Sequence, residues 1–184
     1  MTLQKEDWIY AGRTLMAAKG VEAVKVEILA RQLEVSKGSF YWHFKNRREL
    51  LEAILQDWEN ETLWLIQQSQ TAATSKERLV KLFALVEEIC KPPDPEAAIF
   101  LWANRDIAVQ ERVRILETKR VGYLTELLQD YGFSEKEASH KAEVAYFALM
   151  GFTDRLARDK GFDSSMKEFN DFLLSLLLSP INYQ

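Results

Sequence analysis

The stretch from Ser36 to Phe44, SKGSFYWHF, combines four aromatic side chains with a lysine and a histidine, and no acidic residue interrupts it. A buried strand would accept the aromatic side chains but not Lys37, and an ordinary exposed loop gains nothing from so many aromatics. Lysine, tyrosine and histidine bond to the phosphates and sugars of nucleic acids, and lysine also reads base edges. The stretch therefore indicates a surface that contacts a partner outside the chain, and nucleic acid suits these side chains.

The beginning of this stretch has the residue types needed for an approach to DNA. Short side chains at Ser36 and Ser39 leave backbone amides exposed, so a helix beginning here can bring its amino end to base edges in a major groove. Gly38 costs about 1 kcal/mol relative to alanine inside a helix, and close approach of the backbone to DNA is a reason to keep it. From this pattern, the residues predicted to contact DNA are Ser36, Lys37, Gly38, Ser39, Tyr41, Trp42, His43, Lys45 and Arg47.

Two short helices joined by a tight turn must position these residues. Residues 26–43 have the apolar spacing of a helix-turn-helix pair, with the small Ala30 where the two helices cross closely. Phe40 and Phe44 are predicted to face inward, whereas Lys37 and its polar and aromatic neighbours face outward. The apolar residues predicted to join the pair are Leu29, Leu33, Val35 and Phe40.

The rest of the chain is predicted to be helical as well. Serine or threonine stands three residues before a glutamate at positions 74, 134 and 165, which is the capping-box pattern of a helix start. No alternating pattern typical of a strand is present. The fold class is therefore all-α, with a three-helix module over residues 1–46 and a larger helical domain over residues 47–184. The predicted helices, about nine, are 4–19, 26–33, 37–43, 46–70, 76–91, 95–104, 108–131, 135–159 and 165–178.

Composition and charge limit the kind of protein. The fractions of hydrophobic (47%) and charged (28%) residues are those of a globular domain, and the single cysteine, Cys90, excludes an internal disulfide. No signal peptide or membrane span is present, so we expect a cytoplasmic protein. The net charge is −4, but residues 1–50 hold nine Lys and Arg against six Asp and Glu, whereas residues 51–184 hold 15 against 22. Only the amino-terminal segment therefore suits a polyanion.

Residues 8–51 strongly resemble the tetracycline-repressor (TetR) family of bacterial transcriptional regulators. The resemblance rests on "AAKG", on "EILARQLEVSKGSFYWHFKNRRELL" and on three short helices followed by a long one. It implies a transcriptional regulator, more often a repressor, that binds a palindromic double-stranded DNA operator as a homodimer. It also implies that residues 47–184 bind a small-molecule effector, which releases the operator, and form the dimer.

Two positions depart from the family pattern. Glu34 stands in the turn where the family usually has glycine, so a non-glycine residue is expected to take a positive φ. Lys25 stands where a capping serine or threonine usually begins the second helix, and lysine opposes the helix dipole. A lysine at that point makes sense if a phosphate neutralises it, so Lys25 joins the predicted DNA contacts.

Two other classes of function fit the sequence less well. An RNA-binding module is suggested by the partial match of KGSFYWHF to an aromatic RNA-recognition signature, but Ser39 stands where a stacking aromatic belongs and the flanks are helical. An all-helical enzyme has no support, because no nucleophile–base pair or glycine-rich phosphate loop is found. No metal site or cofactor is expected, since His43 and His140 are far apart in sequence and Cys90 has no partner motif.

The last two predicted helices carry a pattern typical of an interface. Small and apolar residues recur at alternating intervals of four and three in residues 138–156, and apolar residues surround most of residues 169–178. A four-helix bundle of two chains would use both helices. The predicted dimer contacts are Ala138, Ala142, Ala145, Leu149, Phe152, Leu156, Phe169, Phe172, Leu173, Leu176 and Leu177.

The helical body is also rich in aromatic residues, which predicts a pocket for an apolar or aromatic effector within the fifth to eighth helices. A few polar residues that could orient such a ligand accompany them. The predicted pocket residues are Trp64, Phe83, Trp102, Asn104, Arg105, Tyr123, His140, Tyr146 and Phe147.

Overall fold

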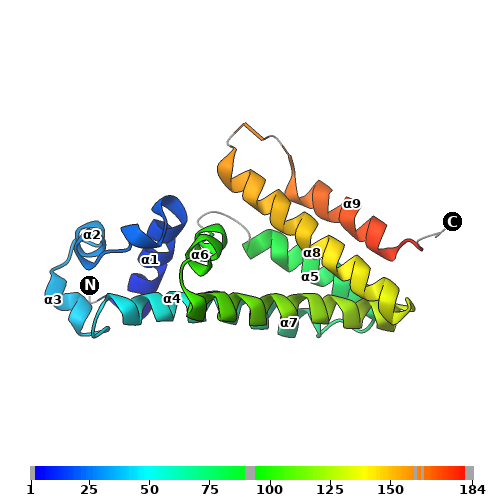
Figure 1. The fold of residues 1–184 in the computed structure, drawn as a ribbon, viewed down its shortest axis with the longest axis horizontal. Helices are drawn as coiled ribbons and strands as arrows, with labels where there is room; N and C mark the ends of the chain where they lie inside the picture. Colours follow the sequence, from blue (N-terminus) through cyan, green and yellow to red (C-terminus); the bar gives the residue numbers. More distant parts are fainter. Residues whose placement is uncertain (1–2, 90–93, 160, 163, 181–184) are drawn as a thin grey trace. The chain divides into compact units, whose positions relative to one another are not determined.

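A computed structural model describes residues 3–89, 94–159, 161–162 and 164–180. Over these residues the secondary structure is entirely helical, which confirms the predicted all-α class (Figure 1). None of the helices within this part of the chain has the length and hydropathy needed to cross a membrane. The α-helices are α1 (Lys5–Lys19), α2 (Val26–Gln32), α3 (Lys37–Tyr41), α4 (Arg47–Ser69), α5 (Ser75–Ile89), α6 (Glu96–Ala103), α7 (Ile107–Tyr131), α8 (Glu135–Arg158) and α9 (Met166–Leu178), with a 3₁₀ helix, η1 (Val21–Ala23), after α1.

The sequence predicted these helices closely, apart from η1 and the end of α3. Gly20 ends α1 with φ of 78°, and the next three residues form the single 3₁₀ turn, too short to show a periodic pattern. Helix α3 ends at Tyr41 and not at residue 43, because Trp42 is its carboxyl-terminal cap and Phe44 N–H turns back to the carbonyl of Phe40. The expected caps at Ser134 and Ser165 both accept a hydrogen bond from the backbone N–H three residues on.

The chain divides into two compact units. The first contains residues 1–61 and 92–113, and the second contains residues 62–91 and 114–184. The first unit thus adds α6 and the beginning of α7 to the three short helices and the first half of α4. These units are defined by packing, so the division by function expected at residue 46 stays a prediction.

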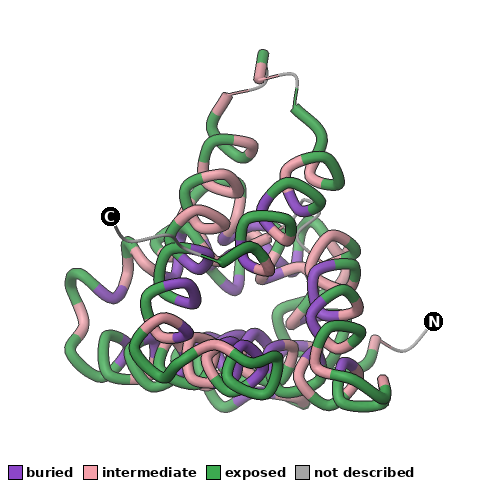
Figure 2. The backbone as a smooth tube through the Cα atoms, turned by 90° about the vertical axis from the view of Figure 1, so that its right-hand side faces the viewer, coloured by how far each residue is buried: buried purple, intermediate pink, exposed green. Residues whose placement is uncertain are grey.

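The core of the first unit forms where the short helices meet α4. The rings of Trp8 and Phe40 meet edge to face with centroids 5.3 Å apart, and Phe40 stacks on Phe44 at 5.3 Å. Helix α1 approaches α4 closely at Gly12, where a Cβ atom would lie 2.7 Å from the Ile54 side chain. The apolar face of each helix therefore holds the module together. Along the helices drawn in Figure 2, buried positions recur between exposed ones.

Polar contacts fix α1, α6 and α7 to α4 within the same unit. Arg13 of α1 bonds to both Asp57 and Glu61, the second contact being bidentate. Arg112 of α7 makes the same kind of bidentate contact with Glu59. The Trp58 indole N–H donates to the carboxylate of Glu96, the first residue of α6, at 2.9 Å. Charge-assisted bidentate pairs are stronger and more directional than single surface ion pairs, so this half of α4 is a rigid support. Arg112 also donates a hydrogen bond to the carboxylate of Glu52 in α4.

The second unit is built around a cluster of buried apolar side chains from α4, α5, α7, α8 and α9. Asn170 of α9 donates to the carbonyl of Phe83 in α5 at 3.2 Å, inside this cluster. The side chain of Lys141 in α8 is buried and donates to the carbonyls of Leu176 and Ser179 at the end of α9. Burial lowers the pKa of Lys141. These contacts join α8 and α9 to each other and to α5.

Candidate nucleic-acid interface

The helix-turn-helix pair consists of α2 and α3, joined by residues 33–36. Glu34 takes the left-handed conformation with φ of 55°, as the missing turn glycine predicted. The turn is closed by a hydrogen bond from the Val35 N–H to the carbonyl of Ala30 at 2.9 Å. Leu29 and Phe40 are fully buried between the helices, so the turn fixes the angle at which α3 leaves α2.

Helix α3 has an inner and an outer face. Phe40 and Phe44 are buried, whereas Tyr41 and Trp42 expose 59% and 89% of their surface. A large aromatic side chain this exposed loses the free energy of apolar burial, which is about 25 cal/mol per Å², unless a partner covers it. The predicted division into a buried and an exposed face is confirmed at these four residues.

Gly38 lies on the exposed side of α3, and the fold itself gives no reason for a glycine there. Its φ is not in the left-handed region, and a Cβ atom would meet only the Ser36 hydroxyl oxygen at 3.4 Å. Alanine is the better helix former by about 1 kcal/mol. The absence of a side chain at Gly38 is therefore unexplained by packing, in contrast to Gly12.

Lys37 is held by a residue of the neighbouring helix. Its ammonium group lies 2.9 Å from a carboxylate oxygen of Glu27, and both side chains are 57% exposed. The hydrogen bond from Lys37 is the largest of the causes that lower the pKa of Glu27. Lys25 immediately precedes α2, has an exposed side chain and makes no side-chain cap, as expected.

Arg47 has a structural role that the sequence did not reveal. Its guanidinium donates from Nε to the carbonyl of Val24 at 2.5 Å and from a terminal nitrogen to the carbonyl of Val21 at 2.6 Å. The first residue of α4 is thereby tied to η1 and to the segment that joins η1 to α2. Lys45 and Arg48 on either side are exposed and make no comparable side-chain contact.

The predicted DNA contacts therefore lie together on the α2–α3–α4 surface of the first unit. Three of them, Ser39, His43 and Arg47, are half-buried. The exposed members are Lys25, Ser36, Lys37, Gly38, Tyr41, Trp42 and Lys45.

The residues predicted to line an effector pocket are divided between the two units. Trp102 and Arg105 lie in the first unit, where they line a cavity beside α6. Phe83, Tyr123 and Tyr146 are buried in the second unit, and Ser69 and Tyr123 share a hydrogen bond of 2.7 Å between their hydroxyl groups. Helical spacing could not separate these packed residues from pocket walls. The exposed members are Trp64, Asn104, His140 and Phe147.

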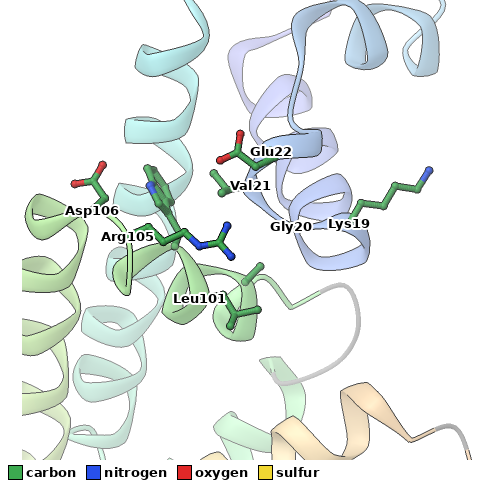
Figure 3. A pocket seen from close by; sticks show the side chains of 9 residues that line it. Lys19, Gly20, Val21, Glu22, Leu101, Arg105 and Asp106 are labelled. Carbon is green, nitrogen blue, oxygen red and sulfur yellow. The ribbon is translucent and has the colours of Figure 1, made fainter.

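The cavity in the first unit lies between the α1–η1 corner and α6 and has a volume of about 310 Å³ (Figure 3). Apolar walls come from Val21, Ala98, Leu101 and Trp102, with Gly20 at the corner. Charged side chains at its edge belong to Lys19, Glu22, Arg105 and Asp106.

The predicted dimer contacts also divide into buried, half-buried and exposed residues. Ala138, Ala142 and Ala145 belong to the core cluster of the chain itself, as do Leu173 and Leu177, so these five are already buried within one chain. The regular spacing of small residues allows close helix packing, but it is satisfied within one chain. Four more are half-buried: Leu149, Phe152, Leu156 and Phe169, with Phe152 stacked on Phe169 at 4.1 Å.

An exposed apolar set remains on α8 and α9, which pack on each other. Phe172 and Leu176, both predicted, expose 64% and 52% of their surface. Val144 and Phe147 of α8 are exposed to the same degree, at 64% and 65%. The spacings of three and four residues put each pair on one side of its helix.

A metal centre is not indicated by the described part of the chain, which contains no group of three or more His, Cys, Asp or Glu side chains that could hold an ion. Cys90 lies outside the described residues.

An α2–turn–α3 pair that exposes a polar and aromatic face on a basic segment defines the class of helix-turn-helix DNA-binding proteins. Residues 9–54 match the family of bacterial regulatory proteins called the tetR family. Residues 9–54 are therefore similar to the amino-terminal domain of tetR-family proteins, as the resemblance predicted.

Relatives and solved structures extend the likeness beyond this segment. The transcriptional repressor KstR2 of Mycolicibacterium smegmatis is 30% identical over 117 residues, which are 63% of this chain and 57% of the relative. The curated relatives that the chain matches are covered over 23% to 57% of their length. A TetR regulator from Legionella pneumophila has the same fold over 96% of this chain and 98% of its own, with a TM-score of 0.80 and 14% identity. The structure of BioQ with its double-stranded DNA operator matches with a TM-score of 0.51 and 21% identity. The match covers 96% of this chain and 98% of the BioQ chain.

Proposed function

We propose that the chain is a ligand-responsive transcriptional regulator, a repressor, that binds a palindromic DNA operator as a homodimer. Its family domain is that of bacterial regulatory proteins, and KstR2, the relative with 30% identity, is a transcriptional repressor. The family likeness favours DNA over RNA and a regulator over an enzyme. In this function α3 enters the major groove, as the second helix of such a pair does.

The observation that carries the proposal is the outer face of α3. Tyr41 and Trp42 keep most of their surface exposed although the Tyr41 ring meets Phe40 edge to face, and Lys37 is exposed beside them. Gly38 lies on this same face and is not required by packing. A DNA backbone or base edge that approaches within contact distance of Gly38 accounts for the missing side chain, and the exposed aromatics then pack on sugars and phosphates.

Substitution of Gly38 separates the needs of the fold from the needs of binding. Gly38→Ala should leave the free energy of unfolding equal or higher by up to about 1 kcal/mol, because alanine is the better helix former. It should weaken binding to an operator selected by the wild-type protein from a random duplex pool. Gly122→Ala is the matched control, since Gly122 lies in α7 with no atom within 4 Å of an added Cβ. It should give the same stability change and unaltered operator affinity.

Two results would contradict operator binding by α3. One is a wild-type protein that selects no sequence from the pool. The other is a Gly38→Ala variant that is as stable as the wild type and binds the selected operator as tightly.

Dimerisation through α8 and α9 is the second part of the proposal. Two recognition helices must lie about one duplex turn apart to read a palindrome, which requires a two-fold dimer. The exposed residues Val144, Phe147, Phe172 and Leu176 supply an apolar surface on these two helices. They replace the buried alanines as the expected contacts.

A further inference from the structure

We propose that the cavity between η1 and α6 binds a small carboxylate with an apolar or aromatic body, and that its occupancy weakens operator binding. The cavity belongs entirely to the unit that carries the helix-turn-helix pair. The binding site is inferred from the cavity itself, whereas its effect on DNA rests on the proposed operator function.

The size and walls of the cavity suit a small amphipathic molecule. Its volume of about 310 Å³ lies at the lower end of the range for ligand sites, about 300–1,000 Å³. Val21, Leu101 and Trp102 form apolar walls, and Leu101 exposes 66% of its surface. An apolar ligand body covers this exposed surface and gains the corresponding free energy of burial.

Charge selects the polar end of the ligand. Arg105 extends from the end of α6 toward Val21 and Glu22, whereas Lys19 and Asp106 lie at opposite edges of the view (Figure 3). Within the described residues the Arg105 guanidinium has no ion pair or hydrogen bond. Glu22 already has a cation nearby, since its carboxylate lies 4.0 Å from Arg47. The Asp106 carboxylate accepts from the backbone N–H of Ala108 at the beginning of α7. The Arg105 guanidinium is therefore the charged group of the cavity that is available to a ligand, and a planar guanidinium prefers a carboxylate that it can bind through two parallel hydrogen bonds.

The cavity wall is connected directly to the DNA-reading helices. The carbonyl of Val21, a wall residue, accepts a hydrogen bond from Arg47, the first residue of α4. The same guanidinium holds the carbonyl of Val24, just before α2 begins. A ligand wedged between η1 and α6 displaces Val21, and this displacement reaches both the start of α2 and the end of the loop that follows α3. A coupling of this kind typically changes an affinity by about 5-fold to 150-fold.

Binding is tested on the DNA-free full chain by ¹⁹F NMR after labelling its five tryptophans with 5-fluorotryptophan. The Trp102 signal is assigned with the Trp102→Phe variant. Three probes of similar shape are titrated to millimolar concentration: 3-phenylpropionate, the neutral 3-phenylpropionamide and the cationic 2-phenylethylamine. The carboxylate should shift the Trp102 signal saturably and bind at least about tenfold more tightly than the amide, a difference typical of one charge-assisted contact.

Two charge-neutralising variants locate the contact. Arg105→Gln should remove the preference for the carboxylate, and because Arg105 is exposed, the fold should be retained. Lys76→Gln, the control, removes an exposed cation on the other unit and should leave the preference unchanged. A Trp102 signal that no probe shifts, or that the amide or amine shifts at equal or lower concentration, overturns the site.

The effect on DNA is measured separately. Saturating 3-phenylpropionate should lower the affinity for the selected operator at least about fivefold in wild-type protein and not in the Arg105→Gln variant. Carboxylate binding with unchanged operator affinity overturns the coupling. Because the NMR titration contains no DNA, its outcome stands apart from a failure to select any operator, which would overturn the proposed function instead.

Discussion

Lys37 of α3 and Glu27 of α2 form an ion pair of 2.9 Å on the exposed side of the helix-turn-helix pair. The ammonium group that should meet DNA is therefore engaged by a carboxylate of the same module in the free protein. Exposed ion pairs contribute only about 0–1 kcal/mol to stability, so the pair breaks readily when a phosphate or a base edge competes for the lysine. Glu27 sets the cost of that exchange.

Replacement of this carboxylate should strengthen DNA binding. Glu27→Gln releases Lys37 and removes a negative charge beside the proposed interface, so operator affinity should rise about three- to tenfold with little change in stability. Fluorescence anisotropy with labelled operator measures the effect. In a double-mutant cycle, Glu27→Gln should have a much smaller effect in the Lys37→Ala background. An equal gain in both backgrounds would show that Glu27 acts through the overall charge and not through Lys37.

Arg47 and Arg48 are adjacent but should respond differently to substitution. Arg47→Ala leaves the carbonyls of Val21 and Val24 without their donor, which should lower the free energy of unfolding by about 1–3 kcal/mol in urea titrations. Its operator affinity should fall without a change in salt dependence. Arg48→Ala should keep full stability, while the slope of log affinity against log salt decreases by about 0.9 for one lost phosphate contact. Identical salt slopes for wild type and Arg48→Ala would remove Arg48 from the interface.

These residues show how much of the site the sequence could predict. The inward position of Phe40 and the positive φ of Glu34 were both predictable, because apolar spacing and a missing glycine are local signals. The role of Arg47 was not, because its acceptors are backbone carbonyls more than 20 residues away, and every residue type supplies a carbonyl. From sequence alone, Arg47 was only a basic residue near the predicted DNA contacts, and nothing distinguished it from Lys45.

The same limit applies to the predictions for the helical body. The spacing of Ala142 and its neighbours correctly predicted close helix packing. It did not show which surface lies opposite, because a helix of the same chain and a helix of a second copy demand the same small residues. Tyr123 likewise lies on an apolar stripe whether it packs in a core or lines a pocket, and only the structure shows that it is buried in the core cluster and bonded to Ser69.

Asp94 gives the first unit a pH-dependent stability. Its carboxyl precedes α6, and burial, together with the charges of Glu96 and Glu61, raises its pKa from 3.8 to about 6 despite a hydrogen bond from the Glu96 N–H and the nearby Arg13. The folded protein therefore holds a proton that the unfolded chain releases between pH 4 and pH 6. Over this window the contribution of Asp94 to stability falls as pH rises, by up to about 3 kcal/mol, and stays constant above it.

Asp94→Asn should remove this penalty. The amide oxygen can still accept the hydrogen bond from the Glu96 N–H, and it carries no charge at any pH. Urea unfolding of both proteins from pH 4 to pH 7.5 gives the difference in stability at each pH. The variant should match the wild type near pH 4 and become progressively more stable up to pH 6. A constant difference across this range would mean that Asp94 ionises normally.

The exposed apolar residues of α9 should decide the oligomeric state. Phe172 and Leu176 expose more than half of their surface in a single chain, so Phe172→Asp combined with Leu176→Asp costs a monomer little stability. In a dimer interface, the same pair puts two carboxylates on each side of a surface that excludes water, which separates the chains. Light scattering should give about twice the chain mass of 21.4 kDa for the wild type and about that mass for the variant.

A control and a functional readout complete this test. Ile107→Asp changes an even more exposed apolar residue, at 79%, in the first unit and should leave the protein dimeric. The double variant should bind the selected palindromic operator far more weakly than the wild type, because each monomer reads only one half-site. Its affinity for a single half-site should be nearly unchanged, since the α2–α3 pair is untouched. A double variant that stays dimeric and folded would move the interface away from this face of α9, and a wild-type monomer at micromolar concentration would contradict the dimer itself.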